Sequence, residues 1–421
     1  MVGGEARAEG AEVGRPLLEV ADVVRAHGDA FLARHGAALS AGQRRALTAV
    51  AACRTAALGG HLHRGGACGH EAIAYNSCRN RHCPKCQGSR TAAWLQREAS
   101  FLLAVDYYHV VFTLPAAVAQ IVWQNRRQGY TWLFQAAQQT LREVAANPRH
   151  LGAQLGWLAV LHTWGQDLHY HPHLHVVAMG GGLACAADGT VTAPPRWVSC
   201  RPGFFLPVRV LSRVCRGKYL ALLQAAQAAG KLRWYGDLAG LAEPEAFRAW
   251  LAAQYQQDWV VYAKPPFGGP EQVLKYLARY THRVALSNRR LVSLEGDQVT
   301  FTAKDYAHGG KVRLVRLPAE EFLRRWVQHV LPWRFLKIRH YGLLANRGRS
   351  ERLSVCRTLV ALVTVVRTVV AALAPADEPA ALRRRCCPVC GSEAWLVVEE
   401  VPPQPAMARG AGGLAPVPDT S

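Results

Sequence analysis

An alternation of histidines constrains this chain more than any other feature. Histidine occupies every second position from His169 to His175, and an apolar run and three glycines follow. A spacing of two places side chains on one face of an extended strand. Pro172 cannot donate a hydrogen bond to a sheet and is typical of the start of a strand. The pattern therefore predicts a strand on which His173 and His175 share one face while Leu174 points to the core.

Two imidazoles held in this way can bind one divalent metal ion and leave positions open for substrate oxygens. The preceding segment 155–164, LGWLAVLHTW, predicts a partner strand joined to the histidine strand by a short polar loop. His162 on that strand, or Gln166 in the loop, could complete the set of ligands. A single His-x-His pattern also arises by chance, so a metal site and a merely structural strand both remain open at this point.

A cysteine cluster lies between residues 53 and 86. Cys83-Pro-Lys-Cys86 places two thiolates on one tight turn, which is a common half of a tetrahedral zinc site. We expect Cys68 and Cys78 to supply the other two ligands of a structural zinc ion. The sequence also offers His61, His63, His82 and Cys53. A second Cys-x-x-Cys, at Cys387 and Cys390, has no obvious partner pair and is weaker evidence for a metal.

Composition narrows the class of protein. The chain has 421 residues, room for two or three domains, and carries 50 Lys and Arg against 29 Asp and Glu, a net charge of +21. Such an excess favours a phosphate-rich partner, and hence DNA. Residues 1–15 have no apolar segment of a signal peptide, and Arg367 interrupts the longest apolar run. We therefore expect a cytoplasmic, nucleoid-associated protein with reduced cysteines and no membrane segment.

Hydrophobic periodicity predicts an α+β fold, with an antiparallel sheet and helices packed on it. Residues 1–15 and 401–421 are expected to be disordered. A helical and zinc-binding domain is predicted for residues 16–100, the sheet domain for 101–345, and a helical region with the second Cys-x-x-Cys for 346–400.

A helix is also predicted within the sheet domain, in the segment YLARYTHR. Tyr276 and Tyr280 are four residues apart and would stack on one helix face, with Arg279 and Arg283 forming an adjacent basic row. A tyrosine pair is commonly part of a core. A phenol, however, also attacks phosphodiesters when a metal polarises the phosphate. Further candidates for DNA contact are Asn288, Arg289, Arg290 and the basic run that contains RFLKIRHYG, although these could equally form a solvated face.

The motifs YNSCRNRHCPKCQ, FTLP, HTWGQDLHYHPHLHVV, GGGL and YLARYTHRVALSNRRL follow one another in this order. Together, over roughly residues 40–350, they resemble insertion-sequence transposases of the two-tyrosine HUH rolling-circle type. The resemblance implies an N-terminal zinc-binding domain and an antiparallel-sheet nuclease domain. It also implies that His173 and His175 form the HUH metal pair and that Tyr276 and Tyr280 are the nucleophiles. Family members carry Cys-x-x-Cys where this chain has Gly65 and Cys68, so His63 or Cys78 would replace one zinc ligand.

The function expected from these features is a DNA strand transferase that needs Mg²⁺ or Mn²⁺ and forms a 5′-phosphotyrosine with single-stranded element ends. Three alternatives stay open. A replication initiator would use the same chemistry, although the N-terminal finger argues against it. A zinc-dependent DNA-binding regulator would need neither the histidines nor the tyrosines. A metallohydrolase would use water as its nucleophile and form no covalent link to DNA.

Overall fold

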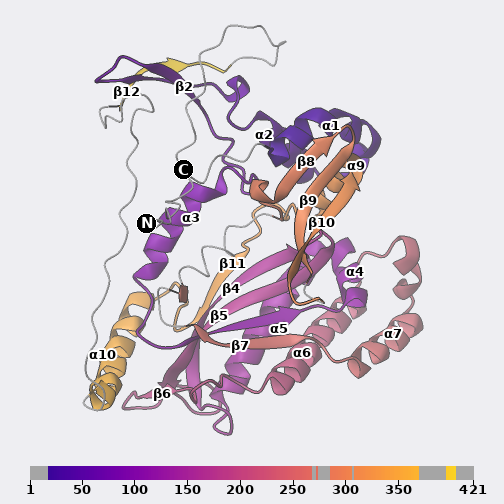
Figure 1. Ribbon diagram of the computed structural model, residues 1–421. Coiled ribbons are helices and arrows are strands. Elements are labelled where there is room, and N and C mark those ends of the chain that lie inside the picture. The colour runs from indigo at the N-terminus through magenta and orange to yellow at the C-terminus, as the bar shows by residue number, and fades with distance from the viewer. Residues whose placement is uncertain (1–17, 268–271, 274–284, 306–307, 369–394, 404–421) are drawn as a thin grey trace, which may run out of the picture. The chain divides into compact units, whose positions relative to one another are not determined.

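The computed structural model describes residues 18–267, 272–273, 285–305, 308–368 and 395–403. It shows helices together with antiparallel sheets, which confirms the predicted α+β class (Figure 1). Of the segments 1–15 and 401–421, expected to be disordered, residues 1–15 and 404–421 lie outside the described residues, whereas Val401 is the last residue of a strand. So do Tyr276, Tyr280, Arg279 and Arg283, and the Cys-x-x-Cys at 387–390.

The described residues form two compact units that interleave along the chain. Unit 1 combines the residues up to Cys86 with Leu286–Val327 and the segment that contains the last strand. Unit 2 combines Gln87–Ala285 with the segment that follows Val327. The sequence-based boundaries at residues 100 and 345 treat the chain as consecutive blocks and so differ from this division. They differ because unit 1 is built from distant parts of the chain. Gln43 of α2 donates to the carbonyl of Val327 at 2.9 Å and so joins the segment that ends at Val327 to the N-terminal helices.

Unit 1 contains two helices near its start, a third helix, and two small sheets. Its helices are α1 (Val20–His35), α2 (Ala41–Ala52) and α9 (Ala319–Gln328). Its strands are β1 (Gly60–Gly65), β2 (Glu71–Tyr75), β8 (Leu291–Glu295), β9 (Gln298–Asp305), β10 (Lys311–Pro318) and β12 (Trp395–Val401). Short 3-10 turns occur at Gly36–Ala38, Ala56–Leu58 and Asn288–Arg290.

Local chemistry explains the main features of unit 1. Ser40 accepts from the backbone of Gln43 while the Gln43 side chain returns to Ser40, a capping box that starts α2. The strands pair in the antiparallel orders β12-β1-β2 and β10-β9-β8. Gly296 lies in the turn between β8 and β9 with a φ of +58°, which glycine adopts readily. The strand β12 lies in a region that the sequence analysis described as helical.

Unit 2 contains a six-stranded sheet with helices on both faces. Its strands are β3 (Tyr107–Thr113), β4 (Ala153–Trp164), β5 (Tyr170–Ala184), β6 (Trp197–Ser199), β7 (Val261–Phe267) and β11 (Ile338–Gly342). Its helices are α3 (Gln87–Ala99), α4 (Ala116–Gln124), α5 (Arg126–Ala146), α6 (Val208–Ala228), α7 (Pro244–Gln256) and α10 (Arg349–Thr368), with a 3-10 segment at Gly236–Ala242. The strand order is β11-β4-β5-β3-β7, and β6 pairs with β5.

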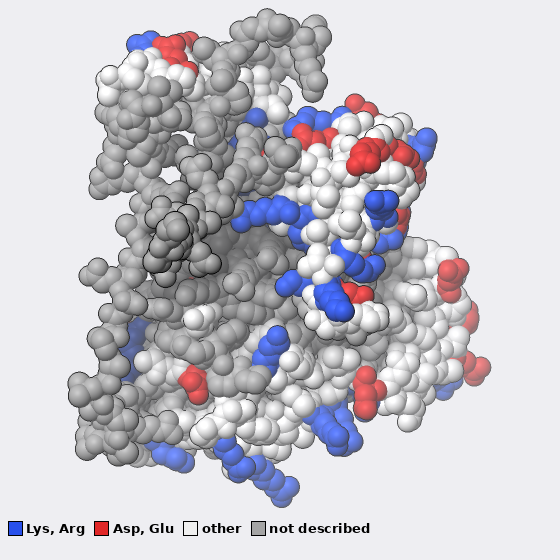
Figure 2. Space-filling view, viewed as in Figure 1, with Lys and Arg blue, Asp and Glu red and all other residues white. Residues whose placement is uncertain are grey.

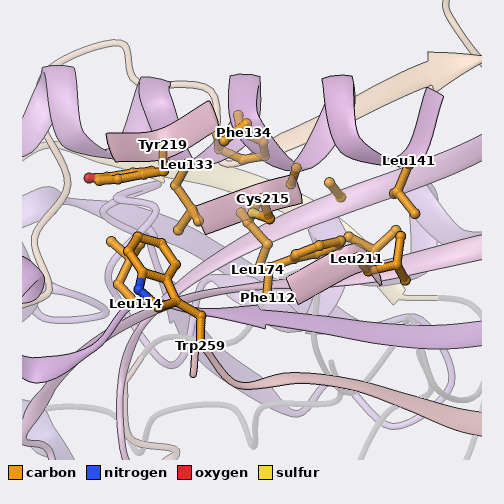
Figure 3. Close-up of a cluster of buried hydrophobic side chains, with 14 of the residues drawn as sticks. Phe112, Leu114, Leu133, Phe134, Leu141, Leu174, Leu211, Cys215, Tyr219 and Trp259 are labelled. Carbon is orange, nitrogen blue, oxygen red and sulfur yellow. The ribbon is translucent and has the colours of Figure 1, made fainter. Parts of the chain in front are cut away.

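Alternation along the strands divides the sheet of unit 2 into two faces. Leu174 and Val176 belong to a large apolar core with residues of α5 and α6, among them Phe134, Tyr219 and Leu220 (Figure 3). Residues of the opposite parity, including Leu158, Val160 and Val177, belong to a second cluster with residues of α3 and α10. We call this second side the histidine face, because His173 and His175 share its parity on β5. The predicted division between Leu174 and its neighbouring histidines is thus confirmed.

The three glycines that follow the histidine strand let other backbones approach β5. A Cβ atom on Gly180 would lie 2.9 Å from the carbonyl oxygen of Asp106, and one on Gly181 would lie 2.6 Å from that of Val198. At Gly182 the corresponding distance, to the Gln154 oxygen on β4, would be 2.1 Å. Any side chain here would force strands apart. The glycines therefore explain how β5 can pair along its length with its neighbours.

A buried histidine fixes the loop between β4 and β5. One ring nitrogen of His329, Nε2, lies 3.0 Å from the carbonyl of Leu168 and must donate, because a carbonyl only accepts. The other nitrogen, Nδ1, then accepts from the Thr163 hydroxyl at 3.1 Å. Leu168 is fully buried and has a φ of +65°, so the loop conformation depends on such support. Burial lowers the pKa of His329 to about 3, so the ring is neutral at neutral pH.

This histidine predicts a specific loss of stability in acid. Between the unfolded pKa of about 6.5 and the folded value of about 3, the unfolded chain binds a proton that the folded chain does not. The contribution of His329 to the free energy of unfolding should therefore be fully present above pH 6.5. It should be lost as the pH drops toward 3, by roughly 3–5 kcal/mol. Denaturant unfolding of wild type and His329→Gln across pH 4–7.5 measures it. The wild type should show the steeper decline, and parallel curves for the two proteins would contradict the assignment.

Candidate metal centres

Four cysteines in unit 1 meet at one point. Their Sγ atoms all lie within 4.8 Å of one another, and the group consists of Cys53, Cys78, Cys83 and Cys86. The Cys53–Cys86 and Cys78–Cys86 sulfur distances are 3.5 and 3.6 Å. Four thiolates bound to zinc at about 2.3 Å in a tetrahedron would lie about 3.8 Å apart. The arrangement thus fits one zinc ion held by four sulfur ligands.

Three of the four cysteines expected to bind zinc lie in this group, and the fourth does not. The turn at Cys83 and Cys86 is supplemented by Cys78, as expected, but Cys68 is exposed and lies outside the group of four. The reason is the β1–β2 hairpin, because Cys68 lies in the turn that joins these two strands. Cys53, one of the further candidates, takes the fourth place from the C-terminal end of α2.

The four cysteines are linked by hydrogen bonds that shift their pKa values in opposite directions, and a buried ion pair holds the turn. The hydrogen bond from Cys78 is the largest influence on Cys53 and lowers its pKa to about 7. The bonds from Cys53, Cys78 and Cys83 hold the pKa of Cys86 well below its usual range, while those of Cys78 and Cys83 are raised. Lys85, within the turn, forms a buried ion pair with Glu19 at 2.6 Å. This pair joins the turn to the start of α1, so the Lys85 side chain is buried within unit 1.

Substitution of single cysteines should distinguish the two ligand sets. The wild-type chain is expected to retain about one zinc ion after dialysis. Cys53→Ser should lose most of this zinc and unfold more readily, because it removes one of four ligands. Cys68→Ser, the matched control, should retain it. Zinc content by atomic absorption and thermal unfolding provide the measurements, and the reverse pattern between the two variants would show that Cys68 is the ligand.

Three histidines form a second group, on the histidine face of unit 2. His162, His173 and His175 offer ring nitrogens that all lie within 4.8 Å of one another. The antiparallel register places His162 of β4 opposite His173 of β5. Within the described part of the chain, no carboxylate joins this group. His162, one of two open candidates for a third ligand, is thus brought by the fold to the pair.

Hydrogen bonds orient both rings of the pair toward a common point. Nδ1 of His173 lies 2.7 Å from the carbonyl of His171 and must donate, which leaves Nε2 with its lone pair. Nδ1 of His175 lies 2.9 Å from Nε2 of His109. The two Nε2 atoms of the pair face each other at 3.1 Å. Nitrogens that bind one ion at adjacent positions lie about 3 Å apart, so this geometry fits a shared divalent metal.

His173 and His175 are in the form that binds a metal. Burial lowers the pKa of His173 to about 4. Burial, followed by the neighbouring His162, holds the pKa of His175 well below its usual range. His109 is also lowered to about 4, first by burial and then by the charge of Lys264. Neutral imidazoles are metal ligands, whereas protonated ones are not.

Sequence reasoning missed two residues beside this group. His109 on β3 stacks on His175 with ring centroids 5.1 Å apart, and Lys264 pairs with His109 in the register of β7 and β3. Tyr262, opposite Val111, is on the same face as Lys264, and both are exposed. His109 occurs in the segment YYHVVFTLP, where its parity could be read. The neighbour across the sheet, however, depends on register, which a single sequence does not provide.

The predicted DNA-contact residues that are described differ from one another. Arg289 is exposed, as a DNA contact requires. Arg290 is half-buried, and its Nε donates to the carbonyl of Thr302 at 2.7 Å while the guanidinium lies 5.7 Å from the ring centre of Phe301. Arg290 therefore supports the β8–β10 sheet. Other basic residues are exposed on β9 and β10, namely Lys304, Lys311, Arg313 and Arg316, and Figure 2 shows Lys and Arg side chains gathered over these strands.

The chain matches known transposases along most of its length. A family model described as "Transposase zinc-binding domain" matches residues 23–114, and one described as "Putative transposase" matches residues 156–352. A Sinorhizobium fredii protein named "Putative transposase y4qJ" is 53% identical over 344 residues, which cover 82% of this chain and 84% of that protein. The "Transposase for insertion sequence element IS801" of Pseudomonas savastanoi pv. phaseolicola is 26% identical over 72% of this chain and 70% of that protein.

No solved structure matches the chain. Among the described residues, no helix has both the length and the apolar character needed to cross a bilayer. The first family model covers the four cysteines, and the second covers the three histidines and the tyrosine segment. The features that the sequence analysis singled out are thus those that the matching families span. The chain belongs to the family of two-tyrosine insertion-sequence transposases that carry an N-terminal zinc-binding domain.

Proposed function

We propose that this transposase cuts and rejoins single DNA strands through a 5′-phosphotyrosine intermediate. The single observation that carries the proposal is the group formed by His162, His173 and His175, whose geometry fits one divalent ion. A regulator that only binds DNA would have no use for three imidazoles whose ring nitrogens meet at one point. The intact group therefore favours catalysis on a phosphodiester.

The donor set also bears on which metal is used. Mg²⁺ prefers oxygen ligands in an octahedral arrangement, whereas imidazole nitrogen suits transition ions. Of the two ions expected from the sequence, Mn²⁺ is the better match to three histidines without a carboxylate. A divalent ion held there would withdraw electron density from the scissile phosphate and favour attack on phosphorus.

The nucleophiles in this proposal are Tyr276 and Tyr280, which lie outside the described residues. Support comes from the residues just before them. Gln272 and Val273 are helical, and Val273 is fully buried in the same cluster as Val160 and Val177 of the histidine face. If the predicted helix continues from Val273, positions three and seven residues later fall on the same side of it. We therefore propose that both tyrosines act at the sheet face that holds the histidines.

The proposed cleavage is a nucleophilic substitution at phosphorus. A phenolate oxygen of Tyr276 or Tyr280 bonds to phosphorus, and the bond from phosphorus to the 3′ oxygen breaks. The phenol proton is released and the leaving oxygen becomes a 3′-hydroxyl. Attack of a 3′-hydroxyl on the phosphotyrosine reverses these events and joins strands, so no nucleotide triphosphate is needed. The DNA is single-stranded at the cleavage point, where a phosphate is accessible from both sides.

Two further side chains assist in this scheme. His109 accepts the Nδ1 proton of His175 in a hydrogen bond and so keeps the opposite nitrogen of His175 available to a metal. Lys264 is exposed on the same face, and its charge is close enough to lower the pKa of both His109 and His175. An ammonium group at this place would attract the phosphate of an approaching strand.

A covalent adduct is the direct test of this proposal. Full-length protein should be incubated with end-labelled single-stranded DNA containing an element end, with Mn²⁺, and separated by denaturing electrophoresis. We expect one labelled band at the mobility of a protein–DNA adduct and a released fragment that ends in a 3′-hydroxyl. Cleaved DNA without any adduct would instead indicate water as the nucleophile.

A further inference from the structure

The segment between α9 and β11, whose last residue lies beside β4, exposes a tryptophan. Trp333 is 65% exposed, more than any other described Trp, Tyr or Phe side chain, and Leu336 is 71% exposed. The strand β11 begins at Ile338, opposite Val160 of β4, and the amide of Leu161 donates to the carbonyl of Lys337. Lys337 therefore lies at the end of β4 that carries His162, and residues 333–336 lead up to it.

The protein holds this segment firmly while the indole stays at the surface. Phe335, two residues on, is buried against Tyr130 and Phe134, with ring centroids 5.6 and 6.3 Å away. Arg127 of α5 donates to the carbonyl of Trp333. Arg334, between the two aromatic residues, has a φ of +56°, which residues other than glycine seldom adopt. The backbone thus turns sharply to bury Phe335 and expose Trp333.

The charge around the tryptophan selects the kind of ligand. Arg127 and Arg334 are exposed, and the Arg334 guanidinium lies 5.9 Å from the centre of the indole ring. No Asp or Glu occurs between Glu321 and Glu351. An exposed aromatic face combined with cations, in a stretch of sequence without acidic residues, suits an unpaired base and its phosphates. A duplex keeps its bases stacked inside and offers no such face.

We propose that Trp333 and its neighbouring arginines form a stacking site for single-stranded DNA. The inference rests on the proposed function, because it assigns a place to the strand whose phosphate the histidine centre would cut. A base stacks on the indole while Arg127 and Arg334 contact the adjoining phosphates. The firm anchoring of Phe335 keeps the site ordered before DNA arrives, so little conformational freedom is lost on binding.

Binding measurements on the full-length chain test this site apart from the chemistry. The probe is a fluorescein-labelled single-stranded 20-nucleotide oligonucleotide, titrated by anisotropy in buffer without added divalent ions, beside the matching duplex. Trp333→Ala should weaken single-strand binding about tenfold or more and change duplex binding less than about twofold. Trp333→Phe, which keeps an aromatic face, should stay within about threefold of wild type. Phe204→Ala is the matched control, because Phe204 is also exposed, at 47%, and should bind as wild type.

Two results would overturn the inference. One is unchanged single-strand affinity of Trp333→Ala; the other is an equal loss for single-stranded and duplex DNA, which would indicate charge rather than stacking. The adduct assay on wild-type protein separates this failure from that of the proposed function. If the adduct forms and Trp333→Ala binds normally, only the stacking site is wrong. If no adduct forms but Trp333→Ala still loses single-strand binding, the stacking site stands and the cleavage chemistry is wrong.

Discussion

Replacing either His173 or His175 by alanine is expected to reduce strand cleavage by about a thousandfold or more. Each substitution removes one of three imidazoles from the histidine group and leaves a gap in the metal site. Loss of the several kcal/mol that a bound divalent ion contributes to the transition state corresponds to such a factor. DNA binding should remain within a few-fold of wild type, since the two side chains are directed at each other rather than at solvent.

The matched control for this prediction is His171→Ala. His171 lies on the same strand and has the same parity but is not a member of the group of three, and its carbonyl, which orients His173, is kept in the variant. Single-turnover cleavage with Mn²⁺, together with anisotropy for DNA binding, measures both properties. A His173→Ala/His175→Ala double variant that cuts DNA at a nearly normal rate would remove this group from the mechanism.

Substitution of both tyrosines should abolish the covalent adduct. In Tyr276→Phe/Tyr280→Phe the two phenol oxygens are gone while the aromatic rings stay, so packing should change little. Each single variant should still form an adduct, because the other tyrosine can attack, but should fail to complete transposition, which needs one tyrosine to hold a DNA end while the other cuts. The expected losses are at least about a thousandfold in adduct for the double variant and in transposition for each single one.

Tyr262→Phe provides a stringent control for the tyrosine pair. Tyr262 is exposed on the histidine face itself and is the described tyrosine best placed to replace a missing nucleophile there. This variant should form the adduct at the wild-type rate. Complete transposition by a Tyr276→Phe single variant would show that Tyr280 suffices alone, and an adduct in the double variant would exclude the helix.

Local patterns predicted the histidine strand and the cysteine turn well, because each depends on few neighbouring residues. The alternation through His173 and His175 gave the strand and its faces, and the spacing of Cys83 and Cys86 gave a turn with two thiols. Cys53 lies 33 residues from Cys86 in the chain, and only the packing of α2 brings the two sulfurs to 3.5 Å. Choosing Cys53 over Cys68 therefore required the fold of the β1–β2 hairpin.

The features that the sequence did not predict depend on long-range register and packing. His109 meets His175 because β3 and β5 pair with one particular alignment, and a shift by one residue would turn His109 to the other face. The segment Leu286–Val327 joins unit 1 through contacts with residues more than 250 positions earlier, such as the bond between Val20 and Asn288. No local periodicity distinguishes such a segment from one that continues the preceding domain.

Identifying the atom that carries the DNA tests the proposed phosphotyrosine mechanism most directly. The adduct formed with Mn²⁺ and single-stranded DNA should be digested with trypsin and nuclease, and the modified peptide sequenced by mass spectrometry. We predict a nucleotide 5′-phosphate on the phenol oxygen of Tyr276 or Tyr280. The mechanism would be contradicted by a phosphate on any other residue, or by cleavage products that leave every peptide unmodified.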